Sequence, residues 1–381
     1  MHLPMPSRRR LLAQAACASL PGWATGAAQA QPRSSPPLGA EWAVAQIVDV
    51  SAAQWDVSRD LLIGARAAWQ AFNTQGGLHG RPIQHAVFEV DGSAFSVQQA
   101  LTEIRHNPRY LALCGTAGDR TAHLVKQCLQ QTPSNLVHAA PWLHTPDASD
   151  PQTFTIFASR QAQIRHALQS LASLGVAELG AVYASHQVYA LAHPDVERVA
   201  TDLKLQLTHQ VSGPSLPQTG RQLSHRAPAI LLFLGGTPEL AQFIQRLEPQ
   251  QRPRYVVALA DVNLHTLRQL SPPHHTCVVA TQIVPMVNAS LPVVRTYRET
   301  LARLFDEAPN SLSLAGYLGA RYVQALLQTL DSPPSRQNVL HAFQHHRALD
   351  LDGFRIKVNN LRPHQAYVTQ SMLRADGRLI G

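Results

Sequence analysis

Two kinds of apolar pattern alternate along this chain. Short continuous apolar runs, which are typical of strands buried on both faces, alternate with segments whose apolar residues recur every three or four positions. The predicted strands are 43–50, 83–90, 110–114, 136–139, 179–184, 230–234, 255–260 and 277–284. Repeated strand–helix units of this kind predict parallel sheets that helices cover on both faces.

Several of the predicted helices carry a start signal. Ser58 is placed to cap a helix whose apolar residues follow a 3.6-residue period over 61–72. Pro194 suits the first turn of a later helix, and Thr237 is placed to cap another that Pro238 opens. Because 381 residues exceed a typical single core, we expect two domains.

Residues 1–30 have the pattern of a secretory signal peptide. A twin-arginine-like basic segment, 7–12, precedes a short Ala-rich run, and Ala28-Gln29-Ala30 supplies the small residues that signal peptidase reads. The run is too short and too polar to span a membrane, so we expect export to the periplasm with cleavage near Ala30. A Pro-rich linker, 31–40, follows. Two alternatives stay open, a disordered basic tail and a lipoprotein modified at Cys17.

The charge of the expected mature chain excludes one class of function. The whole chain has 32 Lys+Arg and 24 Asp+Glu, and residues 1–30 hold three Arg and no acid, which leaves 29 − 24 = +5. No basic cluster with interleaved aromatic residues remains, so nucleic-acid binding is not expected. Cys114, Cys128 and Cys277 are too few for a disulfide framework. A single Cys114–Cys128 bridge and simple packing of the two thiols are the alternatives.

A glycine-punctuated segment at 69–83 is the most informative motif. Gly76, Gly77 and Gly80 fall where a helix must end and the backbone must turn tightly before the strand at 83–90. Other motifs accompany it in order along the chain: Gln46, Ser51, Gly64-Ala65, Asn73, Asp91-Gly92, Gly115-Thr116-Ala117-Gly118, Gln282-Ile283-Val284-Pro285, Gly316-Tyr317, Ala320-Arg321 and Asp352-Gly353-Phe354. From about residue 42 to the C-terminus, the chain resembles the type I periplasmic binding proteins of the leucine/isoleucine/valine-binding kind.

That resemblance implies an α/β fold with two doubly wound parallel-sheet lobes and a three-segment hinge. Lobe one would take 41–155 and 285–332, and lobe two would take 156–284 and 333–381. A small-molecule solute would bind between the carboxyl ends of the strands of both sheets, and closure of the lobes would present it to an ABC permease in the inner membrane. The protein would be a monomer with no cofactor and no enzymatic activity. The alternative is a periplasmic ligand sensor that presents the same fold to a signalling partner.

Positions near the expected strand ends supply the candidate ligand-binding residues. They are Ser51, Trp55, Thr116, Asp119, Trp142, Arg160, Tyr189, Thr237 and Asp261. Alternatives remain for several of them. Trp55 is either an aromatic wall or surface packing, Asp119 either a ligand contact or a helix N-cap, and Arg160 either a carboxylate partner or half of a surface ion pair. Asp261 is either a cation partner or a cap before Asn263.

Three departures from the family pattern affect the expected solute. Asp119 stands where relatives place a Ser or Thr that holds a ligand carboxylate, and its charge opposes an anion there. Phe157 stands where many relatives have an arginine, and Arg160 stands where they have an aromatic residue. The segment that begins at Ser185-His186 lacks the acidic residue that relatives carry there. We expect a small polar organic solute, an amino acid or a carboxylate-bearing metabolite.

The 19 histidines raise the question of a metal site. His341 and His345 would share one helix face, and His346 and the His274-His275 pair add candidates. A zinc or copper site needs three or four convergent ligands, and the sequence brings none together, so no metal site is expected. The chain has no Gly-x-Ser-x-Gly, phosphate-loop or dinucleotide motif, and no catalytic residues are expected.

Overall fold

The computed structural model describes residues 42–132, 134–145, 150–213, 215–223, 228–247, 254–270, 276–346, 348–358 and 367–381. The predicted signal peptide (1–30), the linker (31–40), Cys17 and the His274-His275 pair lie outside these ranges. The described residues belong to one compact unit. Within them, no helix is both long and apolar enough to cross a membrane.

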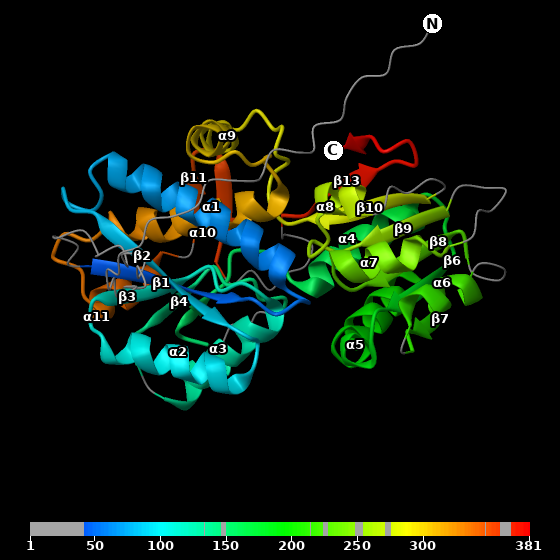
Figure 1. Cartoon of the computed structure of the whole chain (residues 1–381), viewed down its shortest axis with the longest axis horizontal. Helices are drawn as coiled ribbons and strands as arrows, with labels where there is room; N and C mark the ends of the chain where they lie inside the picture. The colour runs from blue at the N-terminus through cyan, green and yellow to red at the C-terminus, as the bar shows by residue number, and fades with distance from the viewer. Residues whose placement is uncertain are drawn as a thin grey trace, which may run out of the picture. The chain divides into compact units, whose positions relative to one another are not determined.

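Five parallel strands form the first sheet, in the order β2-β1-β3-β4-β5. They are β1 (Trp42–Asp49), β2 (Ile83–Val90), β3 (Tyr110–Cys114), β4 (Val137–Ala139) and β5 (Thr153–Phe154). Helices α2 (Ala94–His106) and α3 (Asp119–Gln131) pack on one face of this sheet. Helices α1 (Trp55–Thr74), α10 (Ser311–Leu327) and α11 (Arg336–His345) cover the other face, with α9 (Pro292–Leu304) beside α1 (Figure 1).

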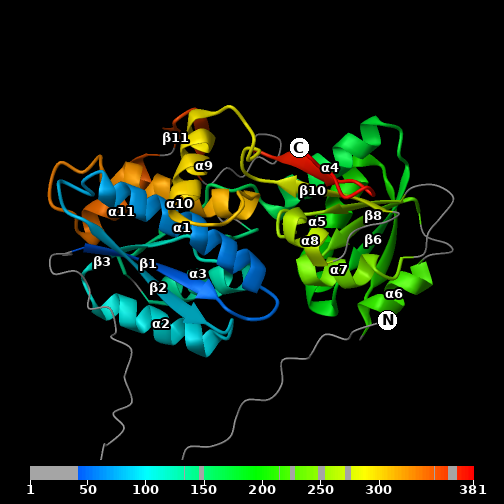
Figure 2. The same ribbon diagram turned by 45° about the horizontal axis from the view of Figure 1, so that its top comes forward.

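The second sheet has seven strands, in the order β14-β13-β10-β9-β8-β6-β7. They are β6 (Glu178–Tyr183), β7 (Gln206–Val211), β8 (Ile230–Leu234), β9 (Arg254–Ala258), β10 (Thr276–Gln282), β13 (Thr369–Leu373) and β14 (Leu379–Ile380). All neighbours are parallel except β13 and β14, which pair antiparallel at one edge. Helices α4 (Arg160–Ser173) and α5 (His186–Leu203) cover one face, while α6 (Leu216–Leu223), α7 (Thr237–Ile244) and α8 (Leu264–Leu270) cover the other (Figure 2).

The two doubly wound sheets confirm the predicted fold class, but one predicted lobe boundary is wrong. The segment from residue 333 was assigned to lobe two, whereas α11 packs on α10, β3 and β4 of the first lobe. Phe343 of α11 contacts Phe154 and Tyr322. The following hairpin, β11 (Ala348–Leu351) and β12 (Phe354–Lys357), also joins the first core. The chain therefore returns to the second sheet only after Lys357, at β13.

A half-buried arginine explains why α11 belongs to the first lobe. The Arg336 guanidinium donates hydrogen bonds to the carbonyl oxygens of Ile104 (2.7 Å), Arg105 (3.0 Å), Asn107 (2.8 Å) and Tyr110 (2.8 Å). Several of these carbonyls lie at the end of α2, where a helix leaves its last carbonyl groups without partners inside the helix. One side chain far along the sequence thus satisfies them.

The predicted helix starts need correction at three positions. Helix α1 begins at Trp55 with Gln54 as its N-cap, so Ser58 lies inside the helix and is buried. Pro194 also lies inside its helix, because the Ser185 hydroxyl accepts the Val188 amide and starts α5 eight residues earlier. Thr237 is the first residue of α7 and follows its N-cap. In α5, the Ser185 cap prevails over the local signal of proline.

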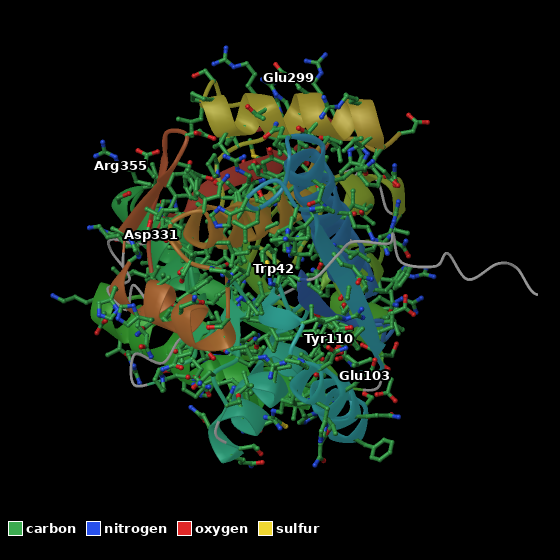
Figure 3. All side chains as sticks on the ribbon, turned by 90° about the vertical axis from the view of Figure 1, so that its left-hand side faces the viewer. Trp42, Glu103, Tyr110, Glu299, Asp331 and Arg355 are labelled. Atoms are coloured by element: carbon green, nitrogen blue, oxygen red, sulfur yellow. The ribbon has the colours of Figure 1, made fainter. Side chains whose placement is uncertain are left out.

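Two helices of the first lobe carry glutamates on their exposed faces. Glu103 on α2 and Glu299 on α9 are exposed and point away from the sheet, whereas Tyr110 is buried in it (Figure 3). Cys114 and Cys128 are free thiols, so the bridge between them is not formed.

Helices α1 and α10 approach so closely that only glycine fits at their crossing. A Cβ atom added to Gly64 would lie 1.7 Å from the carbonyl oxygen of Ser313. A Cβ atom added to Gly316 would lie 1.9 Å from the carbonyl oxygen of Leu61. Since the obstructing atoms are backbone, neither helix has a side chain that can move aside.

We expect Gly64→Ala to lower the free energy of unfolding by at least about 3 kcal/mol, because the methyl group forces the two helices apart. Gly213→Ala is the matched control, since no atom lies within 4 Å of the added Cβ there, and its effect should stay within about 0.5 kcal/mol. Urea denaturation of both variants measures the difference. A Gly64→Ala variant as stable as the control would contradict the packing.

Candidate functional site

A cavity of about 400 Å³ lies where the carboxyl ends of the strands of both sheets meet. The first lobe contributes residues that follow β1, β2, β3 and β4, and the second contributes residues that follow β6, β8 and β9. Its charged lining residues are Asp49, Asp91, Asp119, Arg120, His144, Arg160, Glu239 and Asp261, and its apolar ones include Val57, Val188, Leu191, Leu234 and Leu259. Parallel sheets place their ligand sites at this edge, so the cavity is the candidate binding cleft.

Four of the predicted site residues line this cleft. They are Ser51, Asp119, Arg160 and Asp261. The other five, Trp55, Thr116, Trp142, Tyr189 and Thr237, are not among its lining residues.

Two of these five do not line the cleft but form hydrogen bonds with the segment that carries Asp261. The Trp142 indole donates to the Asp261 carboxylate at 2.6 Å, and Trp142 is almost fully buried. The Thr237 hydroxyl accepts the Asn263 amide at 3.0 Å. Both residues position the loop that carries Asp261.

The remaining three have other surroundings. Thr116 is fully buried and shares a hydrogen bond with His138. Trp55 leaves about half of its surface exposed, which agrees with the surface alternative. Tyr189 packs edge-on against Tyr183 and stacks on His193 at a ring distance of 4.5 Å.

A network of ion pairs crosses the cleft from one lobe to the other. The Arg160 guanidinium of α4 lies 2.9 Å from the Asp119 carboxylate of α3, which also accepts the His144 backbone amide at 2.7 Å. The His144 imidazole lies 2.9 Å from the carboxylate of Asp261, which Trp142 also contacts. First-lobe Asp119 and His144 are thereby bound to second-lobe Arg160 and Asp261.

The pKa values of the paired groups shift toward the charged forms. Burial disfavours the charged imidazole of His144, but the carboxylates of Asp261 and Asp119 outweigh it and raise the His144 pKa. Burial would raise the pKa of Asp261, but His144 and Trp142 outweigh it and lower that pKa. The pair is therefore charged in mildly acidic solution.

The structure excludes some of the alternative roles left open by the sequence. Gly118 is the N-cap of α3, so Asp119 is not a helix cap, and the Arg160 pair is largely buried rather than superficial. The Asn263 side-chain oxygen accepts hydrogen bonds from the backbone amides of His265 and Thr266 at the start of α8. Asn263 therefore caps this helix, and Asp261 does not.

Glu239 is a cleft carboxylate that the sequence analysis did not single out. Its Oε2 atom is buried and has no hydrogen-bond partner among the described residues. Burial, with the nearby charges of Asp56 and Asp261, outweighs backbone hydrogen bonds at Glu239 and Gly236 and raises the pKa of Glu239. An acid in the first turn of a helix is commonplace because it complements the helix dipole, so its sequence position gave no sign of this environment.

Two other carboxyl groups near the cleft, Asp56 and Asp60, also have raised pKa values. Burial raises the pKa of Asp56, and it raises the pKa of Asp60 to about 6 although Asp60 accepts a hydrogen bond from Asn263 across the lobes. Arg120 lines the first-lobe side and makes no ion pair with the described residues. The unpaired charges of the cleft are thus mainly acidic, with Arg120 as the exception.

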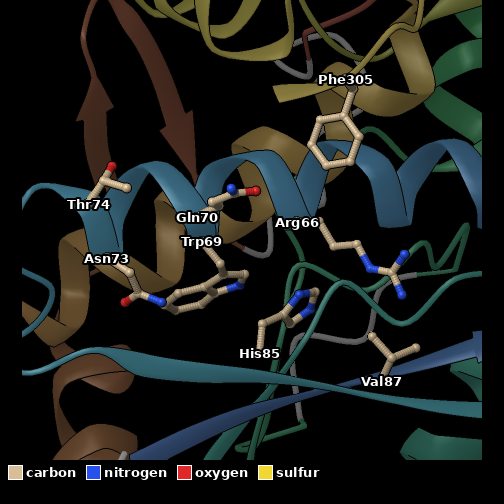
Figure 4. Close-up of a pocket in the computed structure, with 8 residues that line it drawn as sticks. All are labelled: Arg66, Trp69, Gln70, Asn73, Thr74, His85, Val87 and Phe305. Atoms are coloured by element: carbon tan, nitrogen blue, oxygen red, sulfur yellow. The ribbon is translucent and has the colours of Figure 1, made fainter. Parts of the chain in front are cut away.

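A second recess, of about 620 Å³, lies on the first lobe between α1 and β2 (Figure 4). Trp69 stacks on His85, and burial, with Arg66 nearby, lowers the pKa of His85 to about 3. The Asn73 amide both donates to and accepts from the Ile83 backbone, at 2.9 Å each, and so fixes the glycine turn. These contacts hold a helix on a strand away from the carboxyl ends of the sheets, so the cleft remains the candidate site.

The comparisons with known proteins identify the family. The model of the periplasmic binding protein family matches residues 41–375. This chain belongs to the periplasmic binding protein family, and the resemblance to its type I, leucine/isoleucine/valine-binding members is confirmed. Proteins of this family and fold are exported, non-enzymatic solute-binding proteins. Among curated proteins, none matches this chain.

Solved structures show the same fold at low sequence identity. An extracellular ligand-binding receptor from Verminephrobacter eiseniae has a TM-score of 0.76 and 18% identity, over 90% of this chain and 100% of its own. A possible leucine/isoleucine/valine-binding protein from Rhodopirellula baltica has a TM-score of 0.72 and 18% identity, over 91% and 98%. An ABC transporter substrate-binding protein from Desulfitobacterium hafniense, in complex with Leu, has a TM-score of 0.66 and 15% identity, over 89% and 98%.

We expect Asp261→Asn to lower the free energy of unfolding by about 3–5 kcal/mol near pH 5, because His144 is left buried without its carboxylate. Because the pKa of His144 is raised, its contribution to the free energy of unfolding falls as pH rises above 6.5. Because the pKa of Asp261 is lowered, its contribution to the free energy of unfolding falls as pH drops below 3.8. The stability lost in Asp261→Asn should therefore be largest between pH 3.8 and pH 6.5. Denaturant titrations of both proteins at several pH values measure this difference.

Asp202→Asn is the control, because Asp202 pairs with Arg165 at the exposed surface and should cost less than about 1 kcal/mol. Equal losses in the two variants, or a loss in Asp261→Asn that does not change with pH, would contradict the buried pair.

Proposed function

We propose that this protein is the exported solute-binding component of an ABC importer and that it captures a small amine-bearing solute, such as an amino acid. The observation that carries this proposal is Glu239, a cleft carboxylate with a buried and unpartnered oxygen. A buried carboxylate oxygen that has no hydrogen-bond donor among the described residues is unfavourable, and a ligand ammonium group supplies both the opposite charge and the missing donor.

The charge balance of the cleft favours an amine over a simple carboxylate ligand. Arg160 is already engaged by Asp119, and it also donates to the Leu191 carbonyl oxygen at 3.0 Å. Arg160 therefore has less capacity for a ligand carboxylate than the sequence suggested. Asp261 is likewise engaged by His144 and Trp142, so Glu239 replaces it as the cation partner.

An amino acid would use both lobes. Arg120 lies at the start of α3 in the first lobe, and Glu239 lies in the first turn of α7 in the second. A zwitterion that places its carboxylate on Arg120 and its ammonium on Glu239 stabilises the closed arrangement, because each charge has its partner on a different lobe. Ser51 and the apolar side chains Leu191 and Leu234 complete the proposed contacts.

The compartment and partner of this function follow from the family and the N-terminus. We propose cleavage of the signal peptide near Ala30, periplasmic localisation as a monomer, and delivery of the solute to an ABC permease in the inner membrane. The Desulfitobacterium neighbour is described as an ABC transporter substrate-binding protein, which supports this partner.

A thermal-shift screen tests the solute class with three matched sets of compounds: amino acids, the amines formed from them by decarboxylation, and the hydroxy acids in which a hydroxyl replaces the amino group. Amino acids and amines of suitable size should raise the melting temperature, since a ligand at 100 times its Kd stabilises the folded state by about 2.7 kcal/mol. Hydroxy acids should not. Stabilisation by hydroxy acids equal to that by amino acids would refute the role of the amino group.

Two variants locate the contacts. Glu239→Gln should abolish the shifts, whereas Arg120→Gln should weaken binding of amino acids and leave amines unaffected. Glu299→Gln is the control, because it removes the same charge from the exposed face of α9. Unchanged binding in Glu239→Gln would remove the basis of the proposal.

A further inference from the structure

The second lobe brings together two histidines and a glutamate that no sequence motif connects. His193 and Glu197 are four residues apart on α5, so they share one face of that helix. His209 comes from β7, the edge strand that α5 packs against (Figure 1). Within the described part of the chain, one potential ligand atom from each of the three lies within 4.8 Å of the others.

A buried tyrosine orients both imidazole rings. Tyr183 of β6 is fully buried, and its hydroxyl lies 3.2 Å from Nδ1 of His209 and 3.4 Å from Nδ1 of His193. On His209 this leaves Nε2 facing Glu197, whose carboxylate oxygen lies 2.5 Å away. Hydrogen bonding of one ring nitrogen commonly fixes the other nitrogen for a metal ion.

We propose that His193, Glu197 and His209 form a binding site for a divalent zinc ion. Two imidazoles and one carboxylate are a typical zinc ligand set, which leaves a fourth position for water. Ligand atoms around tetrahedral zinc lie about 3.3 Å apart. The His209 and Glu197 atoms, now 2.5 Å apart, therefore have to separate slightly, and the atoms that lie farther apart, up to 4.8 Å, have to approach by about 1.5 Å at most. The Glu197 side chain is 45% exposed and the His209 side chain is 25% exposed, so both can move and both are accessible to the ion.

The site is separate from the solute contacts but shares a helix with them. Gln187, Val188, Leu191 and Ala192 of α5 line the cleft, and His193 directly follows them. Zinc bound to α5 and β7 together would fix this helix on the edge of the sheet. Zinc binding would therefore stabilise the wall of the cleft without occupying it.

The test measures zinc affinity of the EDTA-treated and dialysed protein by competition with a chromophoric chelator. The wild-type protein should bind one zinc ion, and His193→Gln and His209→Gln should each bind it roughly 100-fold more weakly or not at all. Tyr183→Phe retains the ring but removes the hydroxyl, so its affinity should fall about 10-fold.

The control is the double variant His341→Gln/His345→Gln. These histidines are also four residues apart on one helix, are exposed, and stack at a ring distance of 3.9 Å, but no acidic third ligand joins them in the described residues. Its zinc affinity should equal that of the wild type. Wild-type binding no tighter than that of the His193→Gln variant, or loss of binding in the control, would overturn the proposal.

Melting curves separate a lost ligand from a lost fold. In EDTA, the histidine variants should melt close to the wild-type protein, and added zinc should raise the melting temperature of the wild type alone. A variant that melts much lower in EDTA is replaced by Glu197→Gln, which removes the carboxylate charge and should weaken zinc binding in the same way. Zinc stabilisation that persists in Glu197→Gln would count against the site.

Discussion

The cleft depends on two ion pairs that join the lobes, Arg160 with Asp119 and His144 with Asp261. Charges this far from water are tolerated only when each has its partner and its hydrogen bonds, which the Trp142 indole and the His144 amide complete. The network therefore sets two properties at once. It holds the strand-end loops in register across the lobes, and it withdraws the most obvious charged residues from the solute.

The architecture was predictable because it rests on local patterns. Buried parallel strands such as β1 and β3 read as continuous apolar runs, and the glycine turn before β2 needs positive φ angles at Gly76, Gly77 and Gly80. The assignment of α11 was not predictable in this way. It depends on Arg336, whose partners at the end of α2 lie more than 220 residues earlier in the chain.

The site was predictable in position but not in role. Residues at strand ends, such as Ser51 and Asp261, had to lie near the cleft because parallel sheets gather those ends at one edge. Whether a carboxylate there is paired or available depends on neighbours such as His144, which is 117 residues from Asp261 in sequence. Glu239 remained unnoticed for the same reason, because its distinguishing feature is a buried Oε2 atom without a partner among the described residues rather than its residue type.

These constraints bear on how closure can be selective. The inter-lobe ion pairs join side chains of the protein itself, and a ligand shifts the lobes only through contacts that differ between the open and closed forms. With the proposed contacts, a solute with one charge would engage either Arg120 or Glu239 but not both. A zwitterion would engage both, and its differential affinity for the closed form would be correspondingly larger. The proposed placement of Arg120 and Glu239 on different lobes would thus favour solutes that carry both an amine and a carboxylate.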